Sequence, residues 1–286
     1  MLTKQIPSVT GALYYYSSSN GAVAVAGFGD HYKNEADVDW TTTSLQTQAD
    51  VGNGSALARH LPAIADEMGI KRILAPSSAK ANGRMIDSAL LTTRIVFDNG
   101  LEVLRNTAEP ADGCLIRPGE AHLLTAGGCA VIIGKHVKPG LRAPVRVGVT
   151  HGSVRSLLNN AASNLLKALD CDPREARFRI EFAIDSELFT YPWDHPVYTN
   201  NQQICEEIFE RFGPEALPGW HLPEEQQKGR ISTSGMIRSQ LVQAGVPEAN
   251  ITLGMQISEG WPFYTTRDSD PARRARRNLS IVAHYA

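Results

Sequence analysis

Apolar and polar residues alternate along the chain in short blocks that predict a mixed α/β fold. Residues 12–16 and 22–27 are strand-like and flank the turn-forming run 17–21, which predicts a hairpin. Residues 54–68 place apolar side chains at helical spacing and end at Gly69, a residue type that often closes a helix. The first third of the chain therefore contains both strand and helix patterns.

Strand and helix patterns continue through the rest of the chain. A second hairpin is expected around Asp98-Asn99-Gly100, a strong turn signal between two apolar blocks. Further strands are expected at residues 71–75, 112–116, 123–133, 146–150, 177–184, 251–257 and 279–283, and further helices at 153–169, 200–212 and 232–244. Residues 213–228 are expected to form a loop. No repeat or linker divides these elements, so we expect one mixed α/β domain, residues 1–286.

Composition excludes several classes of function. The 286 residues are 42% hydrophobic and 20% charged, which is typical of a globular protein with a sizeable core. A net charge of -2 without a sustained basic stripe argues against nucleic-acid binding. In the one basic run, residues 273–277, we expect Arg273, Arg274 and Arg276 to form a solvated face. No apolar stretch is long enough to cross a bilayer and no signal-peptide pattern is visible, so we expect a cytoplasmic protein without membrane contact.

The cysteines indicate free thiols. They are widely spaced, include no Cys-x-x-Cys pair and lie in a chain too large to depend on disulfides: Cys114, Cys129, Cys171 and Cys205.

One of these thiols lies near an imidazole if two neighbouring apolar runs pair. Cys129 belongs to the run 121–133, and His151 directly follows the run 145–150. Pairing the two runs would build a Cys/His site, the arrangement of many nucleophilic and zinc centres. A neighbouring imidazolium lowers the pKa of a thiol and so favours the thiolate nucleophile. The alternative for Cys129 is burial as a small hydrophobic residue.

Four segments, residues 112–126, 147–157, 241–251 and 262–281, resemble stretches of one known family in the same order. This family is the YfiH-like proteins, which are often labelled laccase-domain or polyphenol oxidase. Its stretches have forms such as Leu-Thr-Ala-Asp-Cys-x-Pro-Val, His-Ala-Gly-Trp-Arg-Gly and Gln-Leu-x-x-x-Gly-Val-Pro-x-x-Asn-Ile. The resemblance implies a four-layer α/β/β/α sandwich with mixed β-sheets. It also implies a zinc pocket of two histidines and one cysteine, with activity on purine nucleosides.

Departures from the family pattern affect the zinc ligands. The family's first histidine corresponds to residues 79–84, which contain no histidine. Without gaps, the family cysteine falls on Gly128, so Cys129 is one position late and would face away on a regular strand. A bulge at Gly127-Gly128 would turn the thiol back toward the pocket. His151 occupies the third ligand position.

At most two ligands are therefore in register, whereas a catalytic zinc ion takes three from the protein. We expect no cofactor, and zinc only if a distant histidine such as His122 or His136 replaces the missing ligand.

Other residues at the matching positions are candidates for substrate binding. Arg155, Arg267 and Arg277 would bind an anionic group through forked hydrogen bonds, or else form surface salt bridges. Asp112 would orient His151 or a substrate hydroxyl, or else cap a turn. The aromatic loop 189–196 would stack on a flat ring, or else pack down.

Three functional hypotheses follow. The first is an enzyme that uses His151 and Cys129 on a nucleoside-like or other small heteroaromatic substrate without zinc, as in specialised biosynthesis. The second is a non-catalytic descendant that binds a ligand or partner. The third is a zinc-dependent purine nucleoside phosphorylase or adenosine deaminase with relocated ligands. The sequence names neither the substrate, the reaction nor the oligomeric state.

Overall fold

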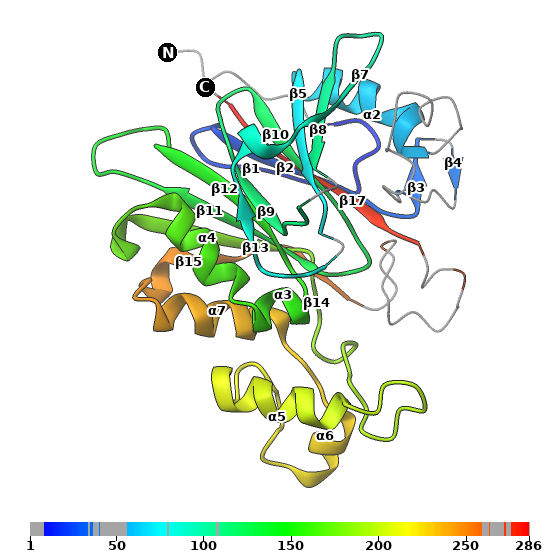
Figure 1. Cartoon of the computed structure of the whole chain (residues 1–286), viewed down its shortest axis with the longest axis vertical. Helices are drawn as coiled ribbons and strands as arrows, with labels where there is room; N and C mark the ends of the chain where they lie inside the picture. The colour runs from blue at the N-terminus through cyan, green and yellow to red at the C-terminus, as the bar shows by residue number, and fades with distance from the viewer. Residues whose placement is uncertain are drawn as a thin grey trace.

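Two β-sheets lie face to face, with helices against their outer faces (Figure 1). The computed structural model describes residues 9–33, 35–36, 40, 56–78, 80–106, 109–258, 263, 272 and 276–285. Within them no helix has the length and apolar character needed to span a membrane.

The larger sheet has seven strands. In spatial order they are β1 (Tyr14–Ser17), β2 (Val23–Phe28), β17 (Asn278–His284), β10 (Glu120–Ala126), β5 (Arg72–Pro76), β8 (Glu102–Asn106) and β7 (Thr93–Val96). It is mixed, because β10 pairs antiparallel with β17 but parallel with β5. The last strand along the chain, β17, joins the hairpin of β1 and β2 to the rest of the sheet.

The smaller sheet has six strands. In spatial order they are β15 (Ile251–Leu253), β13 (Ala176–Glu181), β11 (Ala130–His136), β12 (Arg146–Gly152), β9 (Gly113–Ile116) and β6 (Met85–Ile86). Two short pairs complete the described strands: β14 (Ala183–Ile184) with β16 (Gln256–Ile257), and β3 (His31–Tyr32) with β4 (Glu35–Ala36).

Helices lie against both outer faces (Figure 1). The described helices are α2 (Ala56–Glu67), α3 (Val154–Leu158), α4 (Ala161–Leu169), α5 (Asn201–Phe212), α6 (Pro223–Lys228) and α7 (Thr233–Gln243), with short 3₁₀ turns η2 (Ser88–Leu90), η3 (Pro173–Glu175) and η4 (Glu248–Asn250). In Figure 1, α2 lies beside the seven-stranded sheet, whereas α4 and α7 lie below the six-stranded sheet. Helices α5 and α6 lie beyond α7, away from the sheets.

Alternate side chains of the strands divide the core into three layers. Leu123 of β10 packs with α2, whereas its neighbour Leu124 packs between the sheets. Likewise Val131 of β11 faces the other sheet, and Ile132 faces α4 and α7. The order of layers is helix, sheet, sheet, helix, which confirms the predicted α/β/β/α sandwich with mixed sheets. We call the layer between the two sheets the inter-sheet layer.

Local patterns identify many elements correctly. Both predicted hairpins are present, as β1–β2 and β7–β8. Helix α2 is followed by Gly69 at φ +67°, a backbone conformation that suits glycine. Helices α5 and α7 begin and end within one or two residues of their expected limits.

The predicted strand 123–133 is wrong, because the chain turns a corner within it. Strand β10 ends at Ala126 in the seven-stranded sheet, and β11 begins at Ala130 in the six-stranded sheet. Gly128 takes φ +87° between them. The apolar run continues across the corner because both strands are buried, so hydrophobicity does not mark the break.

Four other predicted segments also differ from the structure. The helix 153–169 divides into α3 and α4 at Asn160, which has φ +64°, and the strand 177–184 divides into β13 and β14 at Phe182, which has φ +58°. The strand 251–257 divides into β15 and β16, and the expected loop 213–228 contains α6.

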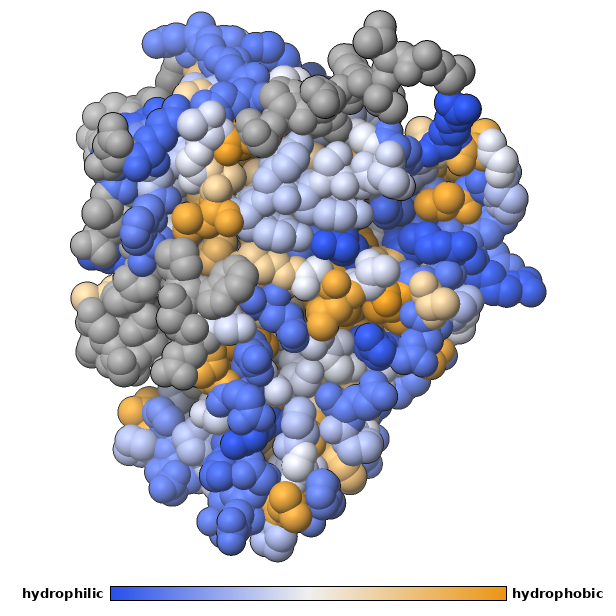
Figure 2. Space-filling view, turned by 180° about the vertical axis from the view of Figure 1, so that it is seen from behind, coloured by the Kyte–Doolittle hydropathy of each residue, from blue (hydrophilic) through white to orange (hydrophobic). Residues whose placement is uncertain are grey.

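The face that Figure 2 shows is mainly hydrophilic where its residues are coloured, and apolar side chains form small separate groups on it.

The contact of α4 with the six-stranded sheet yields a testable prediction. A Cβ added at Gly148 would lie 2.6 Å from Cδ1 of Leu165, which is fully buried. We expect Gly148→Ala to lower the free energy of unfolding by about 1–3 kcal/mol through overpacking. Leu165→Ala should lower it by about 2–5 kcal/mol through a cavity.

The double variant should lose about 1 kcal/mol less than the sum of the single losses, because the new methyl group enters the space that Leu165 leaves. Urea unfolding of the four proteins measures this difference. Strict additivity would contradict the described contact.

Candidate active site

The candidate thiol and imidazole lie at one end of the inter-sheet layer. Strands β11 and β12 pair antiparallel, with Val131 opposite His151. Val131 and Val149 both pack in the inter-sheet layer, so His151, two residues after Val149, faces it as well. Cys129 lies two residues before Val131 and interacts with the His151 ring. Pairing of the two apolar runs thus brings them together, as the sequence indicates.

The face toward which the Cys129 side chain points is set where the chain passes from one sheet to the other, and not by a bulge within one strand. Gly127 and Gly128 are both buried and connect β10 to β11 at the corner. The positive φ of Gly128 lets the chain reverse its local direction there. Cys129 therefore lies on the same face as Val131 and the other residues of β11 that point into the inter-sheet layer. It does so although Cys129 comes one position later in the sequence than the cysteine of the family pattern.

Asp112 holds the His151 ring from the other side. Its side chain is 1% exposed, and Oδ1 lies 3.4 Å from Nδ1 of His151. The His151 backbone N–H donates to the Asp112 carbonyl at 2.9 Å, so backbone and side chain contacts run between the same two residues. Of the two alternatives for Asp112, orientation of His151 agrees with this geometry.

A glycine that the sequence analysis did not identify holds Asp112 in turn. The backbone N–H of Gly83 donates to Oδ2 of Asp112. Gly83 has φ +68°, and a Cβ there would lie 2.2 Å from the carbonyl oxygen of Asn159. Only glycine fits this close approach to the chain between α3 and α4. No local pattern in residues 79–84 indicates this role, because the contact joins distant parts of the chain.

The surroundings keep the His151 ring protonated. Burial favours the neutral ring, but the negative charge of Cys129 and hydrogen bonds with Asp112 and Cys129 outweigh it and raise the pKa of His151 to about 10. The negative charge of Cys129 is the largest of the effects that raise this pKa. The result is an imidazolium between a carboxylate and a sulfur.

His122 is a second, neutral imidazole near this pair. Burial, followed by the charge of His151, lowers the pKa of His122 to about 3. Both of its ring nitrogens are buried without a hydrogen-bond partner among the described residues. Because strand alternation places His122 with Leu124, it faces the inter-sheet layer. His136, in contrast, lies at the far end of β11 and contacts Glu175 at 3.1 Å.

The candidate arginines lie in different settings. Arg155 on α3 is exposed, and its guanidinium makes no hydrogen bond to a described residue. Arg277 directly precedes β17, where Asn278 donates to the Ala126 carbonyl at 3.2 Å beside the Gly127-Gly128 corner. Its own Nη1 donates to the Arg276 carbonyl. Arg267 lies outside the described residues.

Aromatic side chains of the loop 189–196 pack against other parts of the protein. Phe189 is buried in the core beneath α4 and α7, and Trp193 meets Trp220 edge to face with ring centroids 6.0 Å apart. The packing alternative therefore accounts for these aromatic side chains.

The described donor groups do not fit the zinc site that the resemblance implies. In the part of the chain that the structure describes, no three His, Cys, Asp or Glu side chains are arranged to hold a metal ion. His151 directs Nδ1 toward Asp112, and its Nε2 has no hydrogen-bond partner among the described residues.

The electrostatic coupling gives a testable prediction. NMR titration should show the His151 ring still protonated well above its ordinary pKa of 6.5, with a transition near pH 10. Because the folded pKa is raised, the stabilisation from the charged ring is complete below about pH 6.5 and is lost as the pH rises toward 10.

Cys129→Ser should lower that pKa, since it removes the negative charge. The ring of His122 serves as an internal control, because it should stay neutral throughout. A transition of His151 near pH 6.5 in the unaltered protein would disprove the coupling.

Comparisons with known proteins relate this architecture to solved structures. No protein-family model and no curated protein matches the sequence. Crystal structures that match over nearly the whole chain include the following three. Hypothetical protein YfiH of Bacillus licheniformis is 16% identical, covers 92% of both chains and has a TM-score of 0.57.

Neisseria meningitidis protein NMB0706, of family DUF152, is 15% identical with a TM-score of 0.64, over 94% of this chain and 96% of its own. YlmD of Geobacillus stearothermophilus is 17% identical with a TM-score of 0.61, over 93% of each. These likenesses confirm the resemblance at the level of architecture: the chain has the fold of the YfiH-like, DUF152 proteins.

Proposed function

We propose that this chain is a Cys/His-centred enzyme of the transferase or hydrolase type. The observation that carries the proposal is the position of the His151 ring, between the Asp112 carboxylate and Cys129. An imidazolium beside a cysteine favours the thiolate, which is the nucleophilic form. A carboxylate on the other ring nitrogen fixes the ring orientation, as in catalytic triads.

The reaction proceeds in two displacements. The Cys129 sulfur attacks an electrophilic carbon of the substrate and forms a C–S bond, while the bond from that carbon to the leaving group breaks. The leaving group takes its proton from His151. A water molecule or a second substrate then gives a proton to His151 and displaces the sulfur, which restores the imidazolium and thiolate.

The substrate in this proposal is a small heteroaromatic molecule, such as a nucleoside-like one. The neutral ring of His122 offers one N–H donor and one acceptor nitrogen, neither of which has a partner among the described residues. Such a pair complements the edge of a nitrogen heterocycle. Arg155, on the helix that follows His151, supplies an uncommitted guanidinium for an anionic substituent.

Zinc has no part in the proposed steps, because the donor set described above does not assemble three ligands. A thiolate nucleophile also suits the cytoplasmic setting that the sequence predicts, since thiols stay reduced there. A role in specialised biosynthesis belongs to the same proposal and rests on the departure of the site from the family pattern.

Cysteine reactivity tests the nucleophile directly. We expect iodoacetamide at pH 7 to alkylate Cys129 faster than Cys171, because burial and nearby acidic groups raise the pKa of the Cys171 thiol. His151→Gln should slow alkylation of Cys129 about tenfold or more by removing the imidazolium. Mass spectrometry of timed digests measures both rates in one sample, with Cys171 as the internal control.

The same variants test turnover. Using a panel of nucleosides and nitrogen heterocycles followed by liquid chromatography, we expect Cys129→Ser and His151→Gln to abolish any activity found, and Cys171→Ser to preserve it. Activity that survives both replacements would refute the dyad. Specific substrate binding without turnover would instead favour the non-catalytic role.

Metal analysis tests the remaining alternative. We expect purified protein to hold clearly less than one zinc ion per chain, and we expect dialysis against a chelator to leave Cys129 alkylation and any turnover unchanged. Stoichiometric zinc that is lost from a Cys129→Ser variant would instead support relocated ligands and a zinc-dependent nucleoside enzyme.

A further inference from the structure

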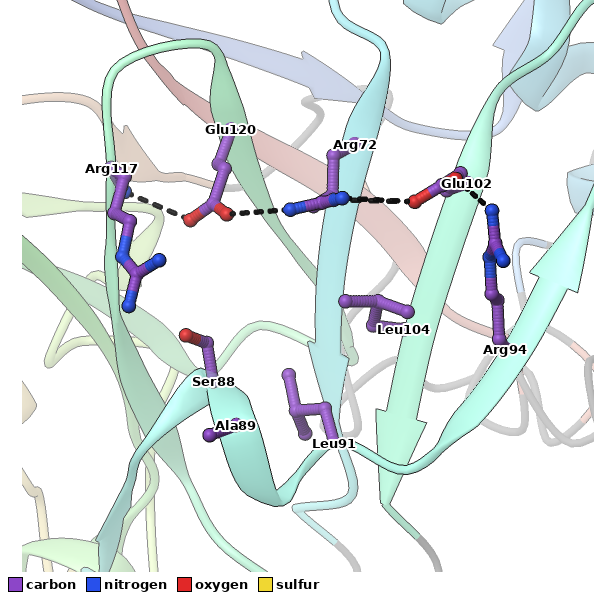
Figure 3. A pocket seen from close by; sticks show the side chains of 9 residues that line it. All are labelled: Arg72, Ser88, Ala89, Leu91, Arg94, Glu102, Leu104, Arg117 and Glu120. Atoms are coloured by element: carbon purple, nitrogen blue, oxygen red, sulfur yellow. Dashed lines mark hydrogen bonds and ion pairs between the residues drawn. The ribbon is translucent and has the colours of Figure 1, made fainter.

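A hollow lined by charged side chains lies at the opposite end of β10 from Cys129. It consists of two adjoining cavities of about 430 and 420 Å³ that share four lining residues: Arg72, Glu102, Arg117 and Glu120. Its walls come from β5, β7, β8 and β10 of the seven-stranded sheet and from η2 (Figure 3). Neither the proposed function nor the resemblance assigns a role to it.

The charges in the hollow form a row that does not balance. Arg72 donates to Glu102 through Nε and Nη2, at 3.3 and 3.2 Å, and its Nη1 lies 3.7 Å from Glu120. Arg94 also pairs with Glu102, and its hydrogen bond is the main cause of the lowered pKa of that carboxyl group. The fourth cationic lining residue, Lys71, pairs with Asp66 at 3.1 Å. Three guanidinium groups thus face two carboxylates, which leaves one positive charge uncompensated.

Arg117 carries the uncompensated charge. Its backbone N–H donates to Oε2 of Glu120 at 2.9 Å, which fixes the loop before β10. Its guanidinium makes no hydrogen bond to a described residue and extends into the hollow toward Ser88 (Figure 3). A guanidinium that is free of partners offers a fork of donors with the geometry of a carboxylate or phosphate group.

The opposite wall of the hollow is apolar. Leu91 and Leu104 both pack against the inter-sheet layer and present side chains to the hollow, beside Ala89. A ligand would therefore meet a cationic group and a hydroxyl on one side and aliphatic carbon on the other. Small-molecule sites combine a few polar groups with an apolar wall in this way.

We propose that this hollow binds a small amphipathic anion. Its carboxylate or phosphate-monoester group would accept hydrogen bonds from Arg117 and Ser88, and its compact apolar group would pack on Leu91 and Leu104. Arg72 stays paired with its two carboxylates and keeps the wall in place. The site is separate from the proposed dyad, because the strand that joins them rises about 3.3 Å per residue over its seven residues.

Titration calorimetry with four probes tests the proposal. We expect benzoate and phenyl phosphate to bind, and we expect benzyl alcohol, which lacks the charge, and inorganic phosphate, which lacks the apolar group, to bind about tenfold more weakly or not at all. Benzoate against phenyl phosphate decides which anionic group the site prefers. Added salt should weaken binding, because the guanidinium is exposed to solvent.

Two variants locate the site. Arg117→Gln should weaken benzoate and phenyl phosphate binding about tenfold, with the thermal unfolding temperature unchanged because the guanidinium has no described partner to lose. Arg238→Gln removes a guanidinium that pairs with Glu248 elsewhere on the surface, and it should bind the probes as the unaltered protein does.

Ser88→Ala is the milder second variant and should weaken binding without loss of fold. Equal binding of all four probes, no binding of either aromatic anion, or undiminished binding by Arg117→Gln would each overturn the proposal.

Discussion

The packing of two sheets across one shared apolar layer is the constraint on which the structure depends. Each strand must present one set of alternate side chains to the other sheet and the opposite set to the helices. The chain passes from one sheet to the other at Gly127-Gly128, so this corner decides which residues of β11 face inward. Cys129 and His151 meet because both lie on the inward-facing set.

That constraint also explains the unusual electrostatics of the site. Polar groups at the end of an apolar layer are removed from water, so each must find a partner or change its protonation state. Asp112 is satisfied by Gly83 and the His151 ring, and His151 keeps its proton. His122 has neither kind of support among the described residues and stays neutral. Two histidines in one layer thus hold different protonation states, one cationic and one neutral.

Elements that depend on contacts between neighbouring residues could be predicted from the sequence. The helical spacing before Gly69 and the turn at Asp98-Asn99-Gly100 are properties of adjacent residues, and both elements form as expected. The approach of Cys129 and His151 is also predictable, because it needs only two neighbouring apolar runs to pair.

The remaining features depend on packing between distant segments. Burial continues across the breaks at Gly128 and Phe182, and the break at Asn160 falls between two segments that share one helical spacing of apolar residues. The roles of Gly83 and His122 follow from how the loop before β6 and strand β10 approach other parts of the fold. A pattern confined to one segment carries no information about that approach.

The position of β17 has a consequence for how the molecule is made. This strand follows all the others along the chain, yet it lies between β2 and β10 and provides the hydrogen-bonded link between them. During synthesis on the ribosome, the first hairpin must therefore wait for the last strand before it can join its sheet. Contacts so distant in sequence slow folding and leave the edges of β2 and β10 open to other chains until β17 arrives.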